Sequence, residues 1–176
     1  PADVFNSANE VLESMDYQVI IVSAQQNKQV LNSVGLQICC AYSAMDFTEN
    51  IDTLLIAGSH NLQNMEDSSY EEFYAWLQVI NKRTRRIGSI CAGAFVLAKA
   101  GLLNGKKATT HWNRSELLRQ RFPQVQVDTK PFYISDGKIH TSGGVSSGID
   151  LALALVEQDY GKDIAVYTGD LLFTLF

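Results

Sequence analysis

The stretch Arg85-Arg86-Ile87-Gly88-Ser89-Ile90-Cys91-Ala92-Gly93-Ala94-Phe95-Val96-Leu97-Ala98 decides the fold of this chain. A short apolar run ends at a single cysteine, three small residues follow, and a helical run comes next. This is the layout of a nucleophile elbow, a sharp turn from a strand into a helix with the reactive side chain at its tip. The turn requires an unusual backbone at Cys91 and places its thiol at the positive end of a helix, where a thiolate is stabilised.

The competing interpretation of Cys91 is a buried cysteine that packs as a small hydrophobe, the commoner fate of free cysteine. An elbow needs small neighbours, and the three residues after Cys91 are Ala, Gly and Ala. The small-residue pattern therefore favours the elbow.

Composition excludes several classes of protein. The chain has 176 residues, of which 46% are hydrophobic and 19% charged, as expected for one globular domain over residues 1–176. Its net charge of −5 has the wrong sign for a domain that binds nucleic-acid phosphates. No apolar run reaches membrane-spanning length and no secretory leader is visible, so no membrane partner is expected.

The cysteines and histidines give no sign of a disulfide framework or a metal site. There are three of each, and two of the cysteines, Cys39 and Cys40, are adjacent in an apolar run where packing is favoured over chemistry. No zinc-ligand spacing occurs, so we expect no metal and no cofactor. Unpaired cysteines fit the reducing cytoplasm. The basic cluster Lys82-Arg83-Arg85-Arg86 is interpreted as solvated cations at the end of a helix.

Strand and helix signals alternate along the chain. Apolar runs predict strands over residues 17–24, 36–41, 51–57, 86–90 and 107–110, and a hairpin of 132–135 with 138–141 turning at Asp136-Gly137. Helices are predicted around 4–15, behind a capping box of Ser69 and Glu72, from Cys91 to Gly101, and over 114–121, 147–160 and 162–173. The alternation predicts an α/β domain, with a doubly wound, mostly parallel sheet flanked by helices.

Ligands bind such sheets beyond the carboxyl ends of the strands. Cys91 follows one predicted strand, Gly58-Ser59-His60 another, His111-Trp112 a third and Gly143-Gly144-Val145 a fourth. A cysteine nucleophile needs a base or a cationic neighbour, and His111 is the best candidate among the histidines. The alternative for His111 is a strand-end histidine bonded to the backbone.

The remaining polar candidates are backbone groups and loop residues. The amides of Ala92 and of Gly58 or Ser59 could form an oxyanion hole, and His60 is a candidate for lining the pocket. His140 lies inside a hairpin strand and is expected to be structural. The glycines at 143–148 lack the spacing of a dinucleotide fingerprint, so close approach of the backbone to the Cys91 pocket explains them better.

Three runs give the chain a resemblance to a known family. They are SICAGAFVLAKAGLLNGKKATTHW at 89–112, FPQVQVD at 122–128 and YISDGKIHTSGGVSSGIDLALALVE at 133–157. Together they resemble the ThiJ/PfpI superfamily, which has the flavodoxin-like, class I glutamine amidotransferase-like fold. The second run and the segment GLLNG point to the N-terminal sensory domains of AraC-family transcriptional regulators.

The resemblance assigns roles to residues of this chain. Cys91 matches the elbow cysteine, His111 the histidine near it, and Gly58-Ser59 the loop whose amides face the cysteine. The family commonly has Pro-Gly-Gly where this chain has Ala57-Gly58-Ser59, which weakens the oxyanion-hole assignment. Many members place an acidic side chain at the end of a first strand, four residues before a proline that matches Pro1. That strand and the regulators' helix-turn-helix module are therefore expected to be missing from the given sequence.

The resemblance implies a ligand-sensing and dimerising domain of an AraC-like regulator. A small-molecule effector is expected near Cys91 and His111, with Gly58, Ser59, His60, Ala92, Trp112, Gly143, Gly144 and Val145 as ligand-binding candidates. The expected partners are a second copy of the chain, and DNA only through the missing module. The alternative is a cysteine-dependent hydratase or hydrolase of the isonitrile-hydratase kind, with Cys91 attacking and His111 assisting.

Overall fold

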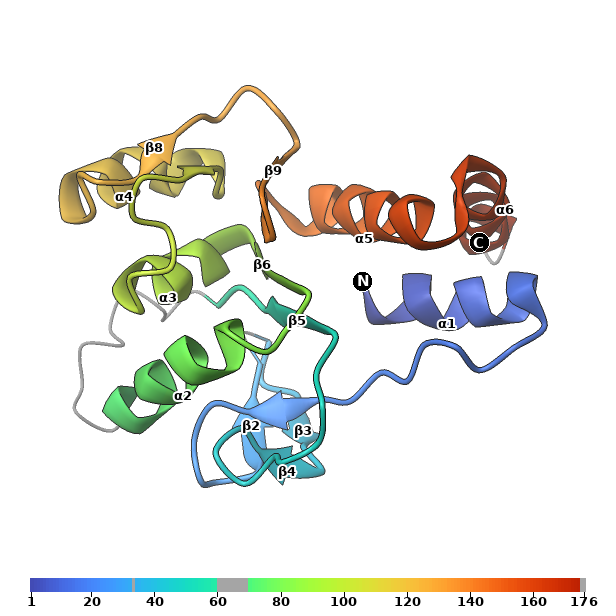
Figure 1. Cartoon of the computed structure of the whole chain (residues 1–176), viewed down its shortest axis with the longest axis horizontal. Coiled ribbons are helices and arrows are strands. Elements are labelled where there is room, and N and C mark those ends of the chain that lie inside the picture. Colours follow the sequence, from blue (N-terminus) through green and yellow to red (C-terminus); the bar gives the residue numbers. More distant parts are fainter. Residues whose placement is uncertain (33, 60–69, 175–176) are drawn as a thin grey trace.

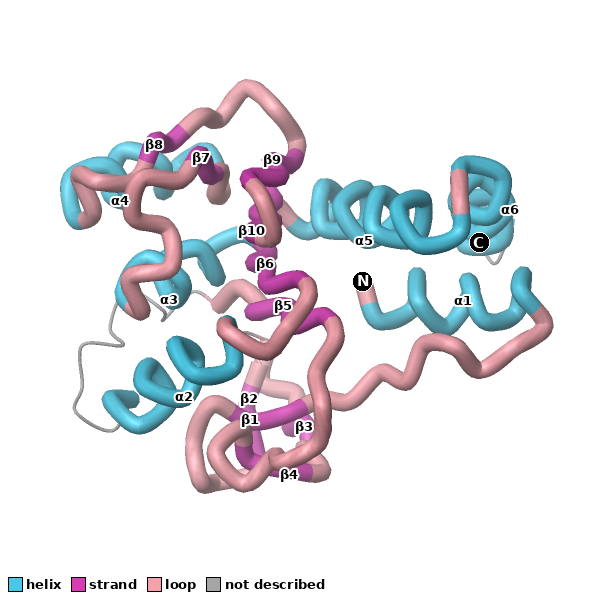
Figure 2. Tube along the Cα trace, in the orientation of Figure 1, coloured by secondary structure: helices cyan, strands magenta, loops and turns pink. Residues whose placement is uncertain are grey.

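A four-stranded sheet forms the centre of the computed structural model, which describes residues 1–32, 34–59 and 70–174. Its order is β5 (Thr53–Ile56), β6 (Arg86–Ile90), β10 (Ile139–Ser142) and β9 (Tyr133–Asp136). The first three strands are parallel and β9 runs antiparallel to β10 (Figures 1 and 2). The carboxyl ends of β5, β6 and β10 therefore meet at one edge, where the sequence predicts the site.

Helices cover both faces of this sheet (Figure 1). One layer holds α1 (Ala2–Leu12), α5 (Val145–Tyr160) and α6 (Lys162–Thr174); across the sheet lie α2 (Glu71–Asn81), α3 (Ala94–Lys99) and α4 (Ser115–Arg121). Each layer has its own core of buried apolar side chains. Leu77, Ile87, Leu97 and Leu118 belong to the α2–α4 side, and Val4, Leu151, Leu155 and Val156 to the other. The predicted doubly wound α/β architecture is confirmed.

Three short strand pairs flank the main sheet. They are β1 (Val22–Ser23) parallel to β4 (Tyr42–Ser43), β2 (Gln29–Leu31) antiparallel to β3 (Gln37–Cys39), and β7 (Lys107–Ala108) parallel to β8 (Gln126–Val127). The first two pairs lie beyond the β5 end of the sheet, and the third lies near α4 (Figure 2).

Most predicted elements form where the sequence indicated. The strand that leads into Cys91 spans the predicted residues, and β9 and β10 make the predicted hairpin, with Gly137 at φ 65° in its turn. Gly101, with φ 75°, follows α3 and ends it in the left-handed conformation that glycine adopts without strain. The predicted capping box at Ser69 falls outside the described residues, and α2 begins at Glu71.

The predicted buried strand over residues 17–24 is wrong for most of its length. Only Val22–Ser23 pairs, and it pairs with β4 rather than with the central sheet. Ile21 is 54% exposed although its residue type favours a strand interior. Among the described strands, the central sheet ends at β5, so the apolar run has no neighbour with which to form a ladder.

The predicted solvated basic cluster is wrong at Arg86. This side chain is only 4% exposed, and its guanidinium lies 2.7 Å from the carboxylate of Asp159 on α5. Arg85 donates to the same carboxylate at 2.6 Å and to Asp52 at 2.8 Å. The cluster ties the sheet to the α5 layer, while Lys82 and Arg83 are exposed as expected.

Candidate functional site

Cys91 lies at the carboxyl end of β6, where the chain turns through a short 3-10 segment, Cys91–Gly93, into α3. Its φ of 54° puts a non-glycine residue in the left-handed region, which is uncommon and costs of order 1 kcal/mol or more. The thiol-bearing residue is partly exposed. The unusual backbone that the sequence predicted is present, and the role of Cys91 as a nucleophile stays a prediction.

Glycines allow the ends of β5 and β6 to press together behind this turn. A Cβ on Gly58 would lie 2.8 Å from the carbonyl oxygen of Ile90 and 2.9 Å from the Cβ of Cys91, closer than real side chains pack. A Cβ on Gly93 would lie 2.4 Å from the carbonyl oxygen of Ile56. The loop after β5 is therefore held against Cys91, where the resemblance to the ThiJ/PfpI superfamily places the Gly58-Ser59 loop. Whether its amides form an oxyanion hole with Ala92 stays a prediction.

The segment after β7 is tied to the same turn. The hydroxyl of Thr110 donates a hydrogen bond of 2.9 Å to the carbonyl oxygen of Cys91. His111 follows, partly exposed, and its Nδ1 lies 2.6 Å from Oδ1 of Asn113. An amide oxygen only accepts, so Nδ1 of His111 donates this hydrogen bond.

Sequence reasoning did not single out Thr110 or Asn113. Their signal is weak, because Ser, Thr and Asn near a turn most often bond to their own backbone. Asn113 follows His111 by two residues, and Thr110 directly precedes it. Their contribution depends on the path of the chain after β7, which residue types do not reveal.

A layer of buried hydroxyl groups lies in and directly after the strands that lead to the site. It consists of Ser89, Thr109, Thr110, Thr141 and Ser142. The backbone N–H of Thr109 donates to Oγ1 of Thr141 at 2.8 Å, which links β7 to the sheet. Among the described residues, the hydroxyls of Ser89 and Thr109 are buried without a hydrogen-bond partner. Such groups are uncommon in protein interiors.

The glycine-rich turn before α5 lies beside Thr110, the residue before His111. The N–H of Gly143 donates to the carbonyl oxygen of Phe132, and that of Gly144 to Oγ of Ser147. A Cβ at Gly143 would lie 3.6 Å from the carbonyl oxygen of Thr110, in ordinary contact, so the closest packing against Cys91 is made by Gly58. Val145, at the start of α5, is exposed.

Large apolar side chains are exposed on the segments around this site. Trp112 is 75% exposed, and its ring lies 5.7 Å from that of His111. Phe132 and Val145 are exposed to a similar degree. Of the predicted ligand-binding residues, Gly58, Ser59, Ala92, Trp112, Gly143, Gly144 and Val145 can be placed at strand or helix ends, and His60 lies outside the described residues.

The other cysteines and His140 lie away from this turn. Cys39 is exposed on the β2–β3 hairpin, and Cys40 is buried, where loss of solvation and the neighbouring Cys39 raise the pKa of its thiol. His140 is buried in β10 and shares a hydrogen bond of 2.8 Å with Oγ of Ser135, in line with a structural role. Among the described residues, no three His, Cys, Asp or Glu side chains are grouped to hold a metal ion.

Two cavities lie elsewhere in the described part of the chain. One, of about 460 Å³, is lined by Glu10, Val11, Tyr167, Asp170 and Leu171 between α1 and α6. The other, of about 350 Å³, lies between residues 18–21 and the segment from β3 to Glu49. No described helix combines the length and apolar character needed to cross a membrane.

Comparison with known proteins agrees with this fold. The sequence profile of the DJ-1/PfpI family matches residues 3–158. Two solved structures have the same fold at 24% sequence identity: a putative transcriptional regulator from Vibrio parahaemolyticus, with a TM-score of 0.83, and an AraC family regulator from Pseudomonas putida, with a TM-score of 0.82. Each comparison covers 97% of this chain, and 88% and 89% of the respective structures.

Curated relatives include transcriptional regulators and an enzyme. The chain is 29% identical over 144 residues to the HTH-type regulator GbdR of Pseudomonas aeruginosa, covering 82% of this chain and 38% of that protein. It is 30% identical to the HTH-type regulator GlxA of Rhizobium meliloti, covering 88% and 46%. It is 34% identical to isonitrile hydratase of Pseudomonas putida, covering 77% and 57%. The chain thus spans about two fifths of the length of these regulators, and it belongs to the DJ-1/PfpI family.

Proposed function

We propose that this chain is the ligand-sensing domain of an AraC-type transcriptional regulator. The observation that carries the proposal is its similarity to two HTH-type regulators over more than four fifths of its own length but less than half of theirs. The remaining length of those relatives leaves room for a helix-turn-helix module. A regulator of this kind works in the cytoplasm, where its DNA is.

The mechanism we propose is a shift between two populations of the full-length protein. A small-molecule effector binds between Cys91, His111 and the loop at Gly58, and it favours one geometry of a homodimer. The dimer geometry sets the spacing of two DNA-binding modules on their half-sites. The exposed Trp112 beside His111 offers an aromatic surface to the effector.

The alternative is an enzyme, a cysteine-dependent hydratase or hydrolase. The observation in its favour is the 34% identity to isonitrile hydratase, together with the left-handed Cys91 and the hydrogen bond between His111 and Asn113. As an enzyme, the thiolate of Cys91 would add to the isonitrile carbon as one C–N π bond breaks, and His111 would deliver a proton to that carbon. Water would then add to the thioimidate, and the C–S bond would break to release the formamide and the thiolate. The Ala57-Gly58-Ser59 loop, which differs from the family's usual sequence, weighs toward the sensor.

Turnover assays on the full-length protein separate the two functions. Isonitriles, amides and α-ketoaldehydes are supplied to the unmutated protein, to Cys91→Ala and to His111→Ala. The sensor predicts no multiple turnover, with stabilisation by a bound effector altered in both variants. The enzyme predicts turnover that Cys91→Ala abolishes and that His111→Ala lowers by about 10²- to 10⁴-fold. Sustained turnover lost in Cys91→Ala would overturn the sensor.

A further inference from the structure

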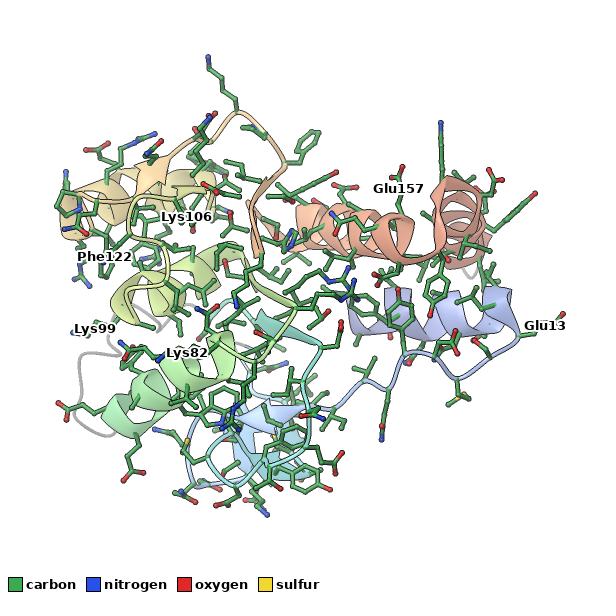
Figure 3. The ribbon with its side chains drawn as sticks, viewed as in Figure 1. Glu13, Lys82, Lys99, Lys106, Phe122 and Glu157 are labelled. Carbon is green, nitrogen blue, oxygen red and sulfur yellow. The ribbon has the colours of Figure 1, made fainter. Side chains whose placement is uncertain are left out.

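Charge is distributed very unevenly between the two sides of the sheet. Residues 1–17 and 145–174, which contain α1, α5 and α6, carry nine acidic side chains and one basic one, Lys162. The rest of the chain carries ten acidic and thirteen basic side chains. Figure 3 shows the contrast: the labelled Glu13 and Glu157 lie on the α1–α5–α6 layer, and Lys82, Lys99 and Lys106 lie across the sheet. One layer is therefore strongly acidic within a mildly acidic protein.

Most of these carboxylates face water. Asp159 is the exception, because Arg85 and Arg86 neutralise it from the sheet. The other eight are exposed: Asp3, Glu10, Glu13, Asp16, Asp150, Glu157, Asp163 and Asp170. Asp16 accepts a hydrogen bond from the hydroxyl of Tyr160 within the layer. The concentration of negative charge on this surface attracts a cationic partner from solution.

The cavity of about 460 Å³ lies within this acidic layer, between α1 and α6, which contact one another. Val11 and Leu171 give it apolar walls, and Tyr167, 61% exposed, adds an aromatic ring. Glu10 and Asp170 supply its charge. This combination suits a lysine or arginine side chain, whose alkyl stem packs on apolar groups while its head meets carboxylates or an aromatic face.

Charge complementarity decides which partner fits. A second copy of the chain would bring the same acidic layer against this one, and like charges across an interface disfavour that pairing. A DNA-binding module has the required sign, because it neutralises phosphates with Lys and Arg. We propose that the α1–α6 groove holds a basic segment of the DNA-binding module of the full-length regulator, an inference that rests on the proposed function.

Docking of this kind makes the acidic layer a competitor of DNA. The carboxylates occupy basic side chains that would otherwise contact phosphates, so the docked regulator binds DNA more weakly than the released one. Both contacts are electrostatic and both weaken as salt shortens the range of charge interactions. A ligand bound at the sheet edge can then regulate DNA binding by favouring release from the groove.

The test measures DNA affinity of the full-length protein with the groove neutralised. Glu10→Gln with Asp170→Asn removes two charges from the groove, and Glu71→Gln with Glu72→Gln removes two exposed charges from α2 across the sheet as the matched control. Binding to a fluorescein-labelled duplex of mixed sequence is followed by anisotropy. We expect the groove variant to bind about fivefold more tightly than the control in low salt, with the difference shrinking in high salt.

Equal affinities of the groove and control variants overturn the docking. If the unmutated full-length protein binds no duplex at any salt concentration, the proposed function fails and the docking fails with it. Hydrogen exchange of the unmutated protein gives a second readout that does not depend on substitution. Adding saturating duplex should speed exchange of amides in α1 and α6 as the module leaves the groove, and unchanged exchange there while DNA is bound contradicts the proposal.

Discussion

Cys91 keeps its left-handed backbone because the residues packed around it have small side chains or none. Gly58 approaches closest, since a methyl group there would meet both the carbonyl oxygen of Ile90 and the Cβ of Cys91 within 3 Å. The neighbours are backbone and a short side chain, which cannot swing aside. The position thus couples the loop after β5 to the conformation of the thiol.

We predict that Gly58→Ala lowers the free energy of unfolding by about 1–3 kcal/mol. The matched control is Gly169→Ala in α6, where a Cβ would meet only Leu153 at an ordinary 3.7 Å and where alanine favours the helix. Urea unfolding followed by circular dichroism measures both. A Gly58→Ala protein as stable as the control would show that the loop moves away freely.

The unpaired hydroxyl of Thr109 gives a second prediction. Replacing it with the isosteric Val removes a buried polar group that has no partner in the described structure, so Thr109→Val should leave stability unchanged or raise it by up to about 1 kcal/mol. Thr141→Val is the control, because it strips the acceptor from the N–H of Thr109 and should cost about 1–3 kcal/mol. An equal loss of unfolding free energy in Thr109→Val and Thr141→Val would contradict this prediction.

At this scale the sequence predicts what depends on neighbours along the chain. Small residues beside Cys91 predicted its strained turn. The resemblance to the ThiJ/PfpI superfamily, and not the glycine itself, placed the Gly58 loop beside the cysteine. The partners of these residues were not predictable, because Thr110 reaches Cys91 across 19 positions and depends on where β7 ends. His60 lies outside the described residues.

Among the elements, β6 and α5 are joined by the most buried ion pair in the described structure. The carboxylate of Asp159, 9% exposed, receives hydrogen bonds from Arg85, Arg86 and Tyr17. Burial tends to raise the pKa of this carboxyl, and the hydrogen bonds from the two arginines outweigh it, so the pKa lies below its usual value.

We predict that Asp159→Asn costs about 3 kcal/mol or more, because it leaves the buried Arg86 with only the exposed carboxylate of Asp52, 3.7 Å away, as a counter-charge. Asp52→Asn is the control: its carboxylate pairs with the same arginines but is 59% exposed, and a loss below about 1 kcal/mol is expected. Guanidinium chloride would screen ion pairs, so urea is the suitable denaturant. Equal losses of unfolding free energy in the two variants would mean that the burial of Asp159 does not strengthen its ion pair.

His140 in β10 gives a pH prediction. Burial, with a smaller effect of Arg86, lowers the pKa of this histidine below its ordinary 6.5. As the pH falls through 6.5, His140 binds a proton in the unfolded chain but not in the folded chain. The contribution of His140 to the free energy of unfolding is therefore fully present above pH 6.5 and is lost progressively below it. The slope reaches at most about 1.4 kcal/mol per pH unit for one group. Unfolding between pH 7.5 and 5 should show it, and His140→Asn should flatten it.

The elements also show where sequence prediction ends. The hairpin at Gly137 and the strand before Cys91 formed as predicted, because turn chemistry and a continuous apolar run are local signals. Arg86 was wrongly expected in solvent, since its partner lies 73 positions away. The run at 17–24 has the residue types of a strand, but only Val22–Ser23 pairs. Whether a neighbouring strand is present depends on the fold and cannot be predicted from the residue types of the run itself.

On the scale of the whole molecule, the central sheet presents one side of β5 without a neighbour among the described strands. Leu55 and Ile56 on β5 are only partly buried, and Val19 and Ile21 of the unpaired run are exposed. Proteins usually cover or block an exposed edge strand, because its unpaired N–H and C=O groups can pair with another chain. Parallel sheets in particular are normally buried. The resemblance to the ThiJ/PfpI superfamily predicts a strand N-terminal to α1, and this edge gives such a strand a place.

We therefore predict that a segment like the one that precedes α1 in the ThiJ/PfpI superfamily, joined ahead of Pro1, adds a parallel strand to β5. The main chain of the added strand would pair with the outward-facing amides of Thr53–Ile56. Its other edge would offer residues 17–21 a strand with which to form hydrogen bonds, so these residues would become less exposed. Hydrogen exchange of the extended protein should be slower in β5 than in the 1–176 chain, and its free energy of unfolding higher. A Gly/Ser extension of equal length is the control, since it has no β-forming side chains to pack. Exchange in β5 that is identical with both extensions would place the upstream segment elsewhere and leave this edge for another partner.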